Sequence, residues 1–195
     1  NNSKELIKIA TIGFDQYLNR IKQASKELQA EVAAEIQLAG VQFRDQAKRD
    51  LIAQRGDTGG LVNSITTKVD NISEVTVSAE KYYAPFIEFG TKGKYRPIPG
   101  TEAIAAQYKG FKRGNFQQFL EAIKAWVKRK GIGRTYNVQT RRKVRQSKDE
   151  LDSIAFAIAM SIIKKGIEPT PFFFKQITPV QQSLNKRIES ILNGL

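Results

Sequence analysis

Apolar positions in the first third of the chain follow two successive spacings. Residues 7–11 alternate between apolar and polar character, which predicts a short strand. From residue 14 to residue 51 the apolar positions recur three, four or seven apart, which predicts roughly ten turns of helix. Ser25 is a candidate N-cap that would divide this stretch into two helices, and the glycines among residues 56–60 end it.

The next third begins with the pattern of a β-hairpin and then loses its periodicity. β-Branched residues alternate with polar ones over 65–69 and again over 75–79, which predicts two paired strands with one buried face and one wet face. A compact aromatic segment follows at 83–89 and stops at Gly90. Residues 92–114 mix prolines, glycines and lysines without periodicity and predict a long loop.

Three further helices are predicted in the C-terminal half. Asn115 is the candidate N-cap of the first, which ends at Lys130-Gly131, and residues 132–148 then show no pattern. Ser147 and Glu150 have the spacing of a capping box at the start of the second helix, which stops at Gly166. Apolar residues over 180–192 outline the third, closed by Gly194. The predicted fold class is α+β, in which a small antiparallel sheet packs with a long N-terminal helix, or two helices, and a C-terminal helix.

The composition excludes several classes of chemistry. The chain has 195 residues, 41% of them hydrophobic, and suits one domain with an ordinary core. It contains no Cys and no His, so it cannot by itself form a zinc cluster, a Cys or Ser/His nucleophile pair, a haem ligand set or a histidine relay. We therefore expect no enzyme activity, no cofactor and no metal. Without a disulfide or a run of 18 apolar residues, we expect a soluble protein that folds in the cytosol.

The positive charge is concentrated in one segment. Residues 92–149 carry 16 basic and 3 acidic residues, a net charge of +13, whereas residues 1–91 carry 11 and 12. Such a field favours a polyanion or an acidic protein surface as partner, although a merely solvated basic loop would have the same composition. The stretch around Tyr136 suits sequence-independent phosphate contacts, without a base-reading scaffold. The candidate contacts to DNA or an acidic partner are Lys92, Lys94, Arg96, Arg134, Arg141, Arg142, Lys143, Arg145 and Lys148.

Three local patterns each have two interpretations. The carboxylates of 149–152 are either catalytic or, more simply, favourable charges at a helix N-terminus. Glu88 lies among aromatic residues, so it is either buried and paired or faces solvent from an alternating strand. The aromatic residues 172–174 follow two prolines and either pack in the core or form an aromatic edge at a subunit contact.

Three segments, in order, resemble one protein family. They are Asp57-Thr58-Gly59-Gly60-Leu61-Val62-Asn63-Ser64-Ile65, then Tyr83-Ala84-Pro85-Phe86-Ile87-Glu88-Phe89-Gly90-Thr91, and late in the chain Pro169-Thr170-Pro171-Phe172. Together they resemble the HK97 gp10-like tail-completion, or head–tail joining, proteins of long-tailed bacteriophages. The resemblance extends over essentially the whole chain and implies subunit contacts at its motif positions, Thr58, Gly59, Leu61, Ser64, Tyr83, Phe86, Glu88, Phe89, Gly90, Thr91, Pro171 and Phe172.

The resemblance implies a structural virion protein without catalytic activity. Such a protein forms a ring of six copies at the neck, made in the bacterial cytoplasm, with the genome passing through its lumen. Its implied partners are further copies of itself, head connector, adaptor or stopper proteins, tail terminator or tail tube proteins, and double-stranded DNA, with no membrane. Residues 92–168 are then a helical, basic insertion within a single domain, 1–195. The alternative is a nucleic-acid-binding accessory protein acting through residues 92–149, and a carboxylate-dependent nuclease comes third.

Overall fold

A computed structural model describes residues 25–55, 59–71, 74–109, 115–133, 136–137, 139, 142–143 and 147–193. The predicted strand at 7–11 and the predicted start of the first helix lie outside these residues. In chain order the elements are α2 (Lys26–Arg55), α3 (Gly60–Asn63), β1 (Ile65–Asn71), β2 (Glu74–Ala79), α4 (Ala84–Phe89), η1 (Lys92–Lys94), α5 (Glu102–Ala106), α6 (Phe116–Lys130), β3 (Tyr136–Asn137), β4 (Arg142–Lys143), α7 (Lys148–Lys165), η2 (Phe174–Gln176) and α8 (Ile177–Asn193).

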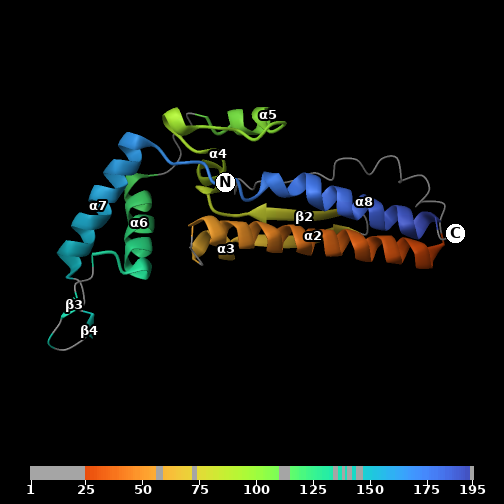
Figure 1. Cartoon of the computed structure of the whole chain (residues 1–195), viewed down its shortest axis with the longest axis horizontal. Helices are drawn as coiled ribbons and strands as arrows, with labels where there is room; N and C mark the ends of the chain where they lie inside the picture. Colours follow the sequence, from red (N-terminus) through yellow and green to blue (C-terminus); the bar gives the residue numbers. More distant parts are fainter. Residues whose placement is uncertain are drawn as a thin grey trace.

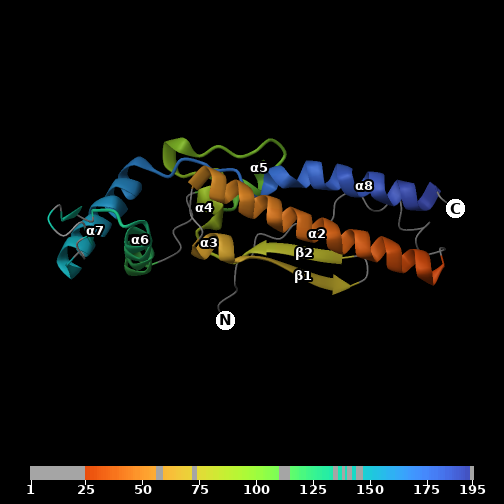
Figure 2. The same cartoon turned by 60° about the horizontal axis from the view of Figure 1, so that its bottom comes forward.

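The long helix α2 organises the main body of the molecule. It packs against α8 along one side and against the β1–β2 hairpin along another, as Figures 1 and 2 show. Ser25 accepts a hydrogen bond at its Oγ from the Leu28 N–H, 3.3 Å away, which confirms the predicted N-cap at this helix. The buried positions recur at helical spacing because one stripe of the helix faces the core; they include Leu28, Val32, Ile36, Ala39, Phe43, Ala47 and Leu51.

A close approach between helix and sheet depends on Gly40. A Cβ at this position would clash with Cγ1 of Val75, so any larger residue would push the hairpin away. The hairpin is antiparallel as predicted, with Thr67 opposite Val77 and Val69 opposite Val75. One face is buried along β2, but Val69 is 49% exposed, because β1 is the outer strand of the pair (Figure 2).

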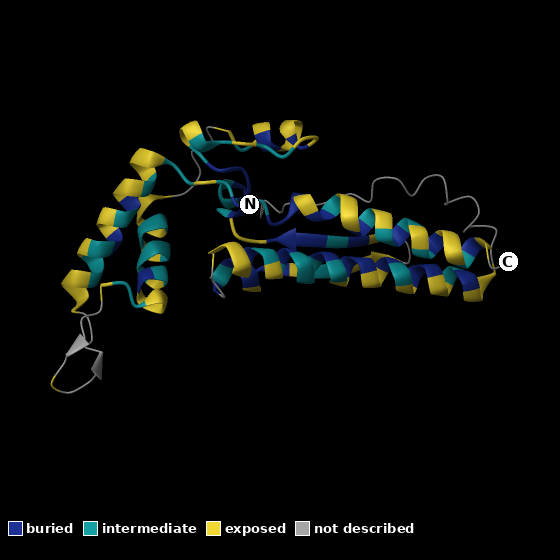
Figure 3. Ribbon diagram, viewed as in Figure 1, coloured by how far each residue is buried: buried dark blue, intermediate teal, exposed yellow. Residues whose placement is uncertain are grey.

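Helices α6 and α7 form an antiparallel pair beside the main body (Figure 1). The predicted caps are confirmed: Asn115 accepts a hydrogen bond from the Gln117 N–H at 2.8 Å, and Ser147 and Glu150 make a reciprocal capping box. Lys124 bridges the two helices through an ion pair with Asp152 at 3.1 Å. The pair buries little of its own apolar surface, as the exposed and intermediate positions along both helices show in Figure 3.

Several predicted elements need correction. The aromatic segment before Gly90 is the helix α4, so the strand proposed for Glu88 is wrong. The predicted loop at 92–114 contains the short helices η1 and α5 within its described part. Where the sequence shows no pattern, β3 and β4 pair with each other, because backbone pairing across a tight hairpin needs no apolar alternation. The last helix begins at Ile177, and its predicted closing residue lies outside the described residues.

Candidate functional site

The second and third family motifs meet at one buried carboxylate. Glu88, on α4, is fully buried. Its Oε2 accepts hydrogen bonds from the N–H groups of Phe172 (2.9 Å) and Phe173 (3.0 Å), and its Oε1 accepts one from Phe174 (3.0 Å). We call this arrangement the Glu88 junction. It joins residues more than 80 positions apart in the sequence and confirms the prediction that Glu88 is paired when buried.

Burial and hydrogen bonding act on Glu88 in opposite directions. Removal from water raises the pKa of the Glu88 carboxyl above its ordinary value, and the three N–H donors oppose that rise. The carboxyl contacts backbone amides in the interior and has no access to a reacting molecule at the surface. Its role is therefore to hold the backbone turn that delivers three aromatic rings to the core.

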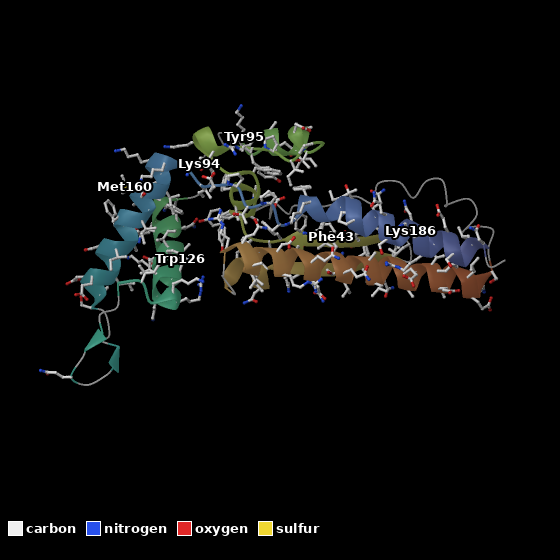
Figure 4. All side chains as sticks on the ribbon, in the orientation of Figure 1. Phe43, Lys94, Tyr95, Trp126, Met160 and Lys186 are labelled. Carbon is white, nitrogen blue, oxygen red and sulfur yellow. The ribbon has the colours of Figure 1, made fainter. Side chains whose placement is uncertain are left out.

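Those three aromatic residues pack inside the chain, as the core interpretation predicts. Phe173 meets Phe43 of α2 edge to face, with ring centroids 5.0 Å apart, and Phe174 stacks on Phe89 at 5.5 Å. Phe172 is also fully buried. Figure 4 shows Phe43 within the body between α2 and α8. These three rings are buried against residues of the same chain. They therefore stabilise the fold of the subunit itself.

Backbone hydrogen bonds extend the Glu88 junction in both directions. The Thr170 N–H donates to the Ile87 carbonyl at 2.7 Å, and the Thr91 N–H donates to the Ile167 carbonyl at 3.0 Å. The Ile167 N–H in turn donates to Oγ1 of Thr91 at 2.8 Å. From the end of α2, Arg55 donates to Oγ1 of Thr170 at 2.6 Å. The segment that follows α7 is thus fixed to both α4 and α2.

Gly90 occupies a position that excludes a side chain. Its φ of +74° lies in the left-handed region that favours glycine. A Cβ there would also lie 2.6 Å from the Lys94 carbonyl oxygen and 2.9 Å from that of Ile167. The glycine of the second motif is therefore required by the close passage of two neighbouring segments of backbone.

The first motif lies at the other end of α4 and touches the α6–α7 pair. Gly59 is buried beneath the guanidinium group of Arg129, whose Nη2 would lie 2.5 Å from a Cβ on the glycine. Ser64 donates its hydroxyl to the Leu61 carbonyl at 2.8 Å, and both residues are buried. Thr58 lies outside the described residues.

The remaining motif residues are partly accessible. Tyr83 packs edge to face on Tyr82 with centroids 5.3 Å apart, while Phe86, Thr91 and Pro171 are half-buried. These are the motif positions at which a second copy has surface to contact. Subunit contact by the motif residues stays a prediction.

The candidate basic residues fall into two groups that the fold does not join. Lys92, Lys94 and Arg96 lie near the C-terminal end of α7, where Lys94 pairs with Glu168 at 2.7 Å. The hydrogen bond from Lys94 lowers the pKa of Glu168. Lys148 lies at the opposite end of α7, about 27 Å away along an 18-residue helix.

The second group is mostly beyond the described side chains. Arg142 and Lys143 form β4 next to the Lys148 end of α7 (Figure 1). Arg134, Arg141 and Arg145 lie outside the described residues. The described candidate residues therefore lie at both ends of the α6–α7 pair and do not form a single continuous patch.

Sequence reasoning missed several exposed residues near these groups. Lys109 places its ammonium 5.6 Å from the centre of the Tyr95 ring, a cation–π contact near the first group. Figure 4 shows Tyr95 and Lys94 next to each other between the main body and α7. The larger omission is apolar: Phe116, Phe156, Met160 and Ile163 are all more than two-fifths exposed. The absence of charged residues over 153–163 could have indicated this exposed apolar surface from the sequence.

Among the described residues, no cluster of three potential metal ligands occurs, and no helix is long and apolar enough to cross a membrane. The carboxylates at the start of α7 lie at its N-terminus as the simpler interpretation predicts, with Glu150 engaged in the capping box. Their placement is that expected for favourable charge at a helix end.

Comparison with known proteins gives one family match. Residues 14–90 match the family model HK97-gp10_like, described as "Bacteriophage HK97-gp10, putative tail-component". No curated protein and no solved structure matches the chain. The match includes the first motif and the second up to Gly90, and it stops before the third, which contacts the second through Glu88. The resemblance predicted from the sequence is confirmed over residues 14–90, which are similar to a family of bacteriophage tail components.

Proposed function

We propose that this protein forms a ring of six copies at the neck of a tailed bacteriophage, where it completes the tail end and joins it to the DNA-filled head. In this proposal the genome passes through the lumen of the ring, and the protein has no catalytic role. The match of residues 14–90 to a phage tail-component family is the observation that carries the proposal.

The charge distribution supports contact with acidic partners. The net charge of +13 within residues 92–149 belongs to the part of the chain that includes α6 and the start of α7. These elements project beside the main body, where a neighbouring neck protein has room to bind them (Figure 1). The two basic groups lie at opposite ends of α7, as expected for an extended docking surface that meets a partner at two points.

Docking on a protein fits this charge better than lining the channel. DNA slides through the neck during ejection, and each phosphate neutralised by a fixed basic residue adds to the attraction that motion has to overcome. We therefore propose an acidic surface on a head connector, adaptor, stopper or tail protein as the partner of the basic segment. Double-stranded DNA in the lumen is the secondary contact.

The direct test is electron microscopy of particles made by the source phage when this gene is silenced. Separate DNA-filled heads and finished tails are the expected products, because the joining step would be missing. Normally joined particles would overturn the neck proposal. Quantifying the protein in mature particles adds a second criterion, since a ring requires several copies in every particle.

A variant tests the basic segment separately from the ring. Replacing Arg141, Arg142, Lys143 and Arg145 together with Gln is expected to reduce head–tail joining. A matched control removes the same amount of charge from exposed lysines elsewhere, at Lys26, Lys68, Lys81 and Lys186. Equal plaque yields from both variants would contradict a docking role for the segment.

The accessory-factor alternative makes a different prediction for the same protein. Binding to duplex DNA in solution would then weaken with salt, by roughly 0.9 in the log–log slope for each phosphate neutralised. Absence from mature particles together with such a slope would favour that alternative over the neck proposal.

A further inference from the structure

Helix α7 is apolar around most of its circumference. Residues 153–163 contain no charged side chain, yet within this run only Ala155 and Ala159 are fully buried. A helix of this kind is normally enclosed on all sides. Among the described elements, α6 packs against one side of α7, and none covers the other side.

The open side of α7 has three large apolar residues in line. Phe156, Met160 and Ile163 are 49%, 45% and 41% exposed and are spaced four and three residues apart, so they share one face of the helix. We call these three residues the α7 outer face. Figure 4 shows Met160 on the side of α7 turned away from α6. Phe116 of α6 extends the apolar surface by meeting Phe156 edge to face at 6.1 Å.

Helix α2 has a second apolar face that the core does not use. Ala34, Leu38 and Val41 have the same spacing of four and three residues, and Leu38 and Val41 are 44% and 37% exposed. We call these three residues the α2 outer face. It lies opposite the buried stripe, and no described element covers that side of α2 in Figure 2. Ala30 and Ile52 continue the face in both directions.

We propose that the α7 outer face of one copy packs antiparallel against the α2 outer face of the next copy. The inference rests on the proposed ring and names the surfaces that build it. The two faces have equal length, and with Leu38 opposite Met160 on antiparallel helices, Phe156 lies within one residue of Val41 and Ile163 within one residue of Ala34. Within one chain the faces do not meet, because α6 lies between α7 and α2 (Figures 1 and 2).

Charge selects the antiparallel orientation. Helix α7 begins with acidic Asp149 and Glu150 and ends with basic Lys164 and Lys165. Helix α2 has the same order, with acidic residues in its first turns and basic residues concentrated in its second half. If Leu38 lies opposite Met160 on antiparallel helices, Asp149 at one end of the contact lies beside Arg49, and Lys164 at the other end lies within one turn of Glu31. Asp152 and Asp45 also approach each other in this register, but each is already paired within its own chain, with Lys124 and with Arg44.

The parallel orientation would bring like charges together. With Leu38 still opposite Met160, Asp149 would lie beside Glu27, and Asp152 would lie within one residue of Glu31. Such juxtapositions disfavour a wrong pairing more strongly than the correct ion pairs favour the right one.

The symmetry of this contact is that of a ring. It joins two different faces of the same chain, so it is heterologous, and each added copy presents a free face for the next one. A contact between two α7 outer faces would be isologous and would stop at a dimer. The proposed contact is therefore of the heterologous kind that a ring requires, in which the rotation between successive copies closes on itself.

Site-specific cross-linking tests the contact, since the natural chain contains no cysteine. The variant with both Leu38→Cys and Met160→Cys is treated with a short bis-maleimide, as purified full-length protein and in assembled particles. Each single substitution is treated in parallel. The matched control combines Met160→Cys with Val69→Cys, which places the second thiol on an exposed residue of β1 that the contact does not include.

The double variant is expected to give a ladder of cross-linked species that ends at the ring. The single variants and the Val69 control are expected to stay monomeric. A dimer from Met160→Cys alone would show α7 pairing with itself and would overturn the proposal. Rings visible by microscopy without the ladder would overturn the α2–α7 contact while leaving the ring intact. Particles without several copies of the protein would overturn the ring and the contact together.

A charge swap gives an independent measure. Lys164→Glu is expected to lower the ladder yield about threefold to fivefold, the size expected for a single surface ion pair, and adding Glu31→Lys is expected to restore it. A ladder that neither substitution changes would contradict the antiparallel register.

Discussion

The Glu88 junction gives the sharpest prediction about the subunit itself. Replacing Glu88 with Gln keeps the shape of the side chain but exchanges one acceptor oxygen for an NH2 group. The amide oxygen of the introduced glutamine is able to accept from the N–H groups of Phe172 and Phe173, as Oε2 does in the natural protein. The NH2 group would then face the Phe174 N–H, which loses its acceptor.

The expected loss follows from that one unsatisfied donor. A buried N–H without an acceptor costs about 1–3 kcal/mol. The substitution also removes the cost of burying a carboxylate, which is real here because burial raises the pKa of Glu88. We therefore expect a net destabilisation of about 1–2 kcal/mol, or a decrease in Tm of about 2–8 °C for a chain of this size. Glu88→Ala loses every acceptor and leaves a cavity, so its cost should be larger, about 3–5 kcal/mol.

The assay is urea unfolding followed by tryptophan fluorescence and far-ultraviolet circular dichroism. Glu102→Gln serves as the matched control, since it removes an exposed carboxylate of α5. A Glu88→Gln variant as stable as the wild type would refute the reasoning that three amides depend on this carboxyl. Unchanged stability of the control together with loss in Glu88→Gln is the expected outcome.

The pH dependence has a definite sign. Because burial raises the folded-state pKa of Glu88 above its ordinary value of 4.5, the folded state binds the proton more tightly than the unfolded chain does. The contribution of Glu88 to stability is therefore complete when the pH is below the ordinary pKa of the carboxyl. It declines as the pH rises through the raised pKa of the folded state. The free energy of unfolding of the wild type should thus exceed that of Glu88→Gln by more at about pH 5 than at about pH 8. A margin that grows with pH would contradict the direction of the shift.

Two further substitutions test local features. Gly90→Ala should destabilise the fold by more than about 1 kcal/mol, because its φ of +74° is strained for alanine and the added Cβ meets the Lys94 carbonyl. The change in the urea midpoint measures this loss, and an unchanged midpoint would contradict the close approach. Ser147→Ala should cost about 1 kcal/mol of local stability at the start of α7, because it removes one half of the capping box. The expected result is faster hydrogen exchange confined to the first turns of α7, and unchanged exchange there would contradict a stabilising role for the cap.

The elements that the sequence predicts well are those set by local chemistry. The helix after Asn115, the capping box of Ser147 and Glu150, and the hairpin at 65–79 all form where their caps and spacings indicate. In each case the residues that decide the structure are neighbours along the chain or directly across a short turn. Such signals survive in a single sequence because no distant contact overrides them.

The sequence predicts only part of the Glu88 junction, because this junction depends on contacts between distant segments of the chain. The aromatic neighbours of Glu88 indicate that a buried carboxylate needs a partner, but its partners are backbone amides, which every residue except proline has. No side chain at 172–174 therefore marks the segment as the partner. The helical form of α4 was missed because a six-residue segment is too short to display a helical period.

The outer faces of α2 and α7 show what a subunit's sequence encodes beyond its own fold. In α2 the apolar positions exceed those that the sheet and α8 can cover, and the surplus lies on one line opposite the core. In α7 the surplus is larger still, since α6 covers only one side of the charge-free run 153–163. An apolar residue at an exposed helix position gains nothing within the monomer, whereas burial against a neighbour contributes about 25 cal/mol for each Å² of apolar surface removed from water. The apolar periodicity of a sequence predicts a helix but does not show which apolar positions contact a neighbouring copy. Those positions can be recognised once the structure shows which ones are buried within the subunit.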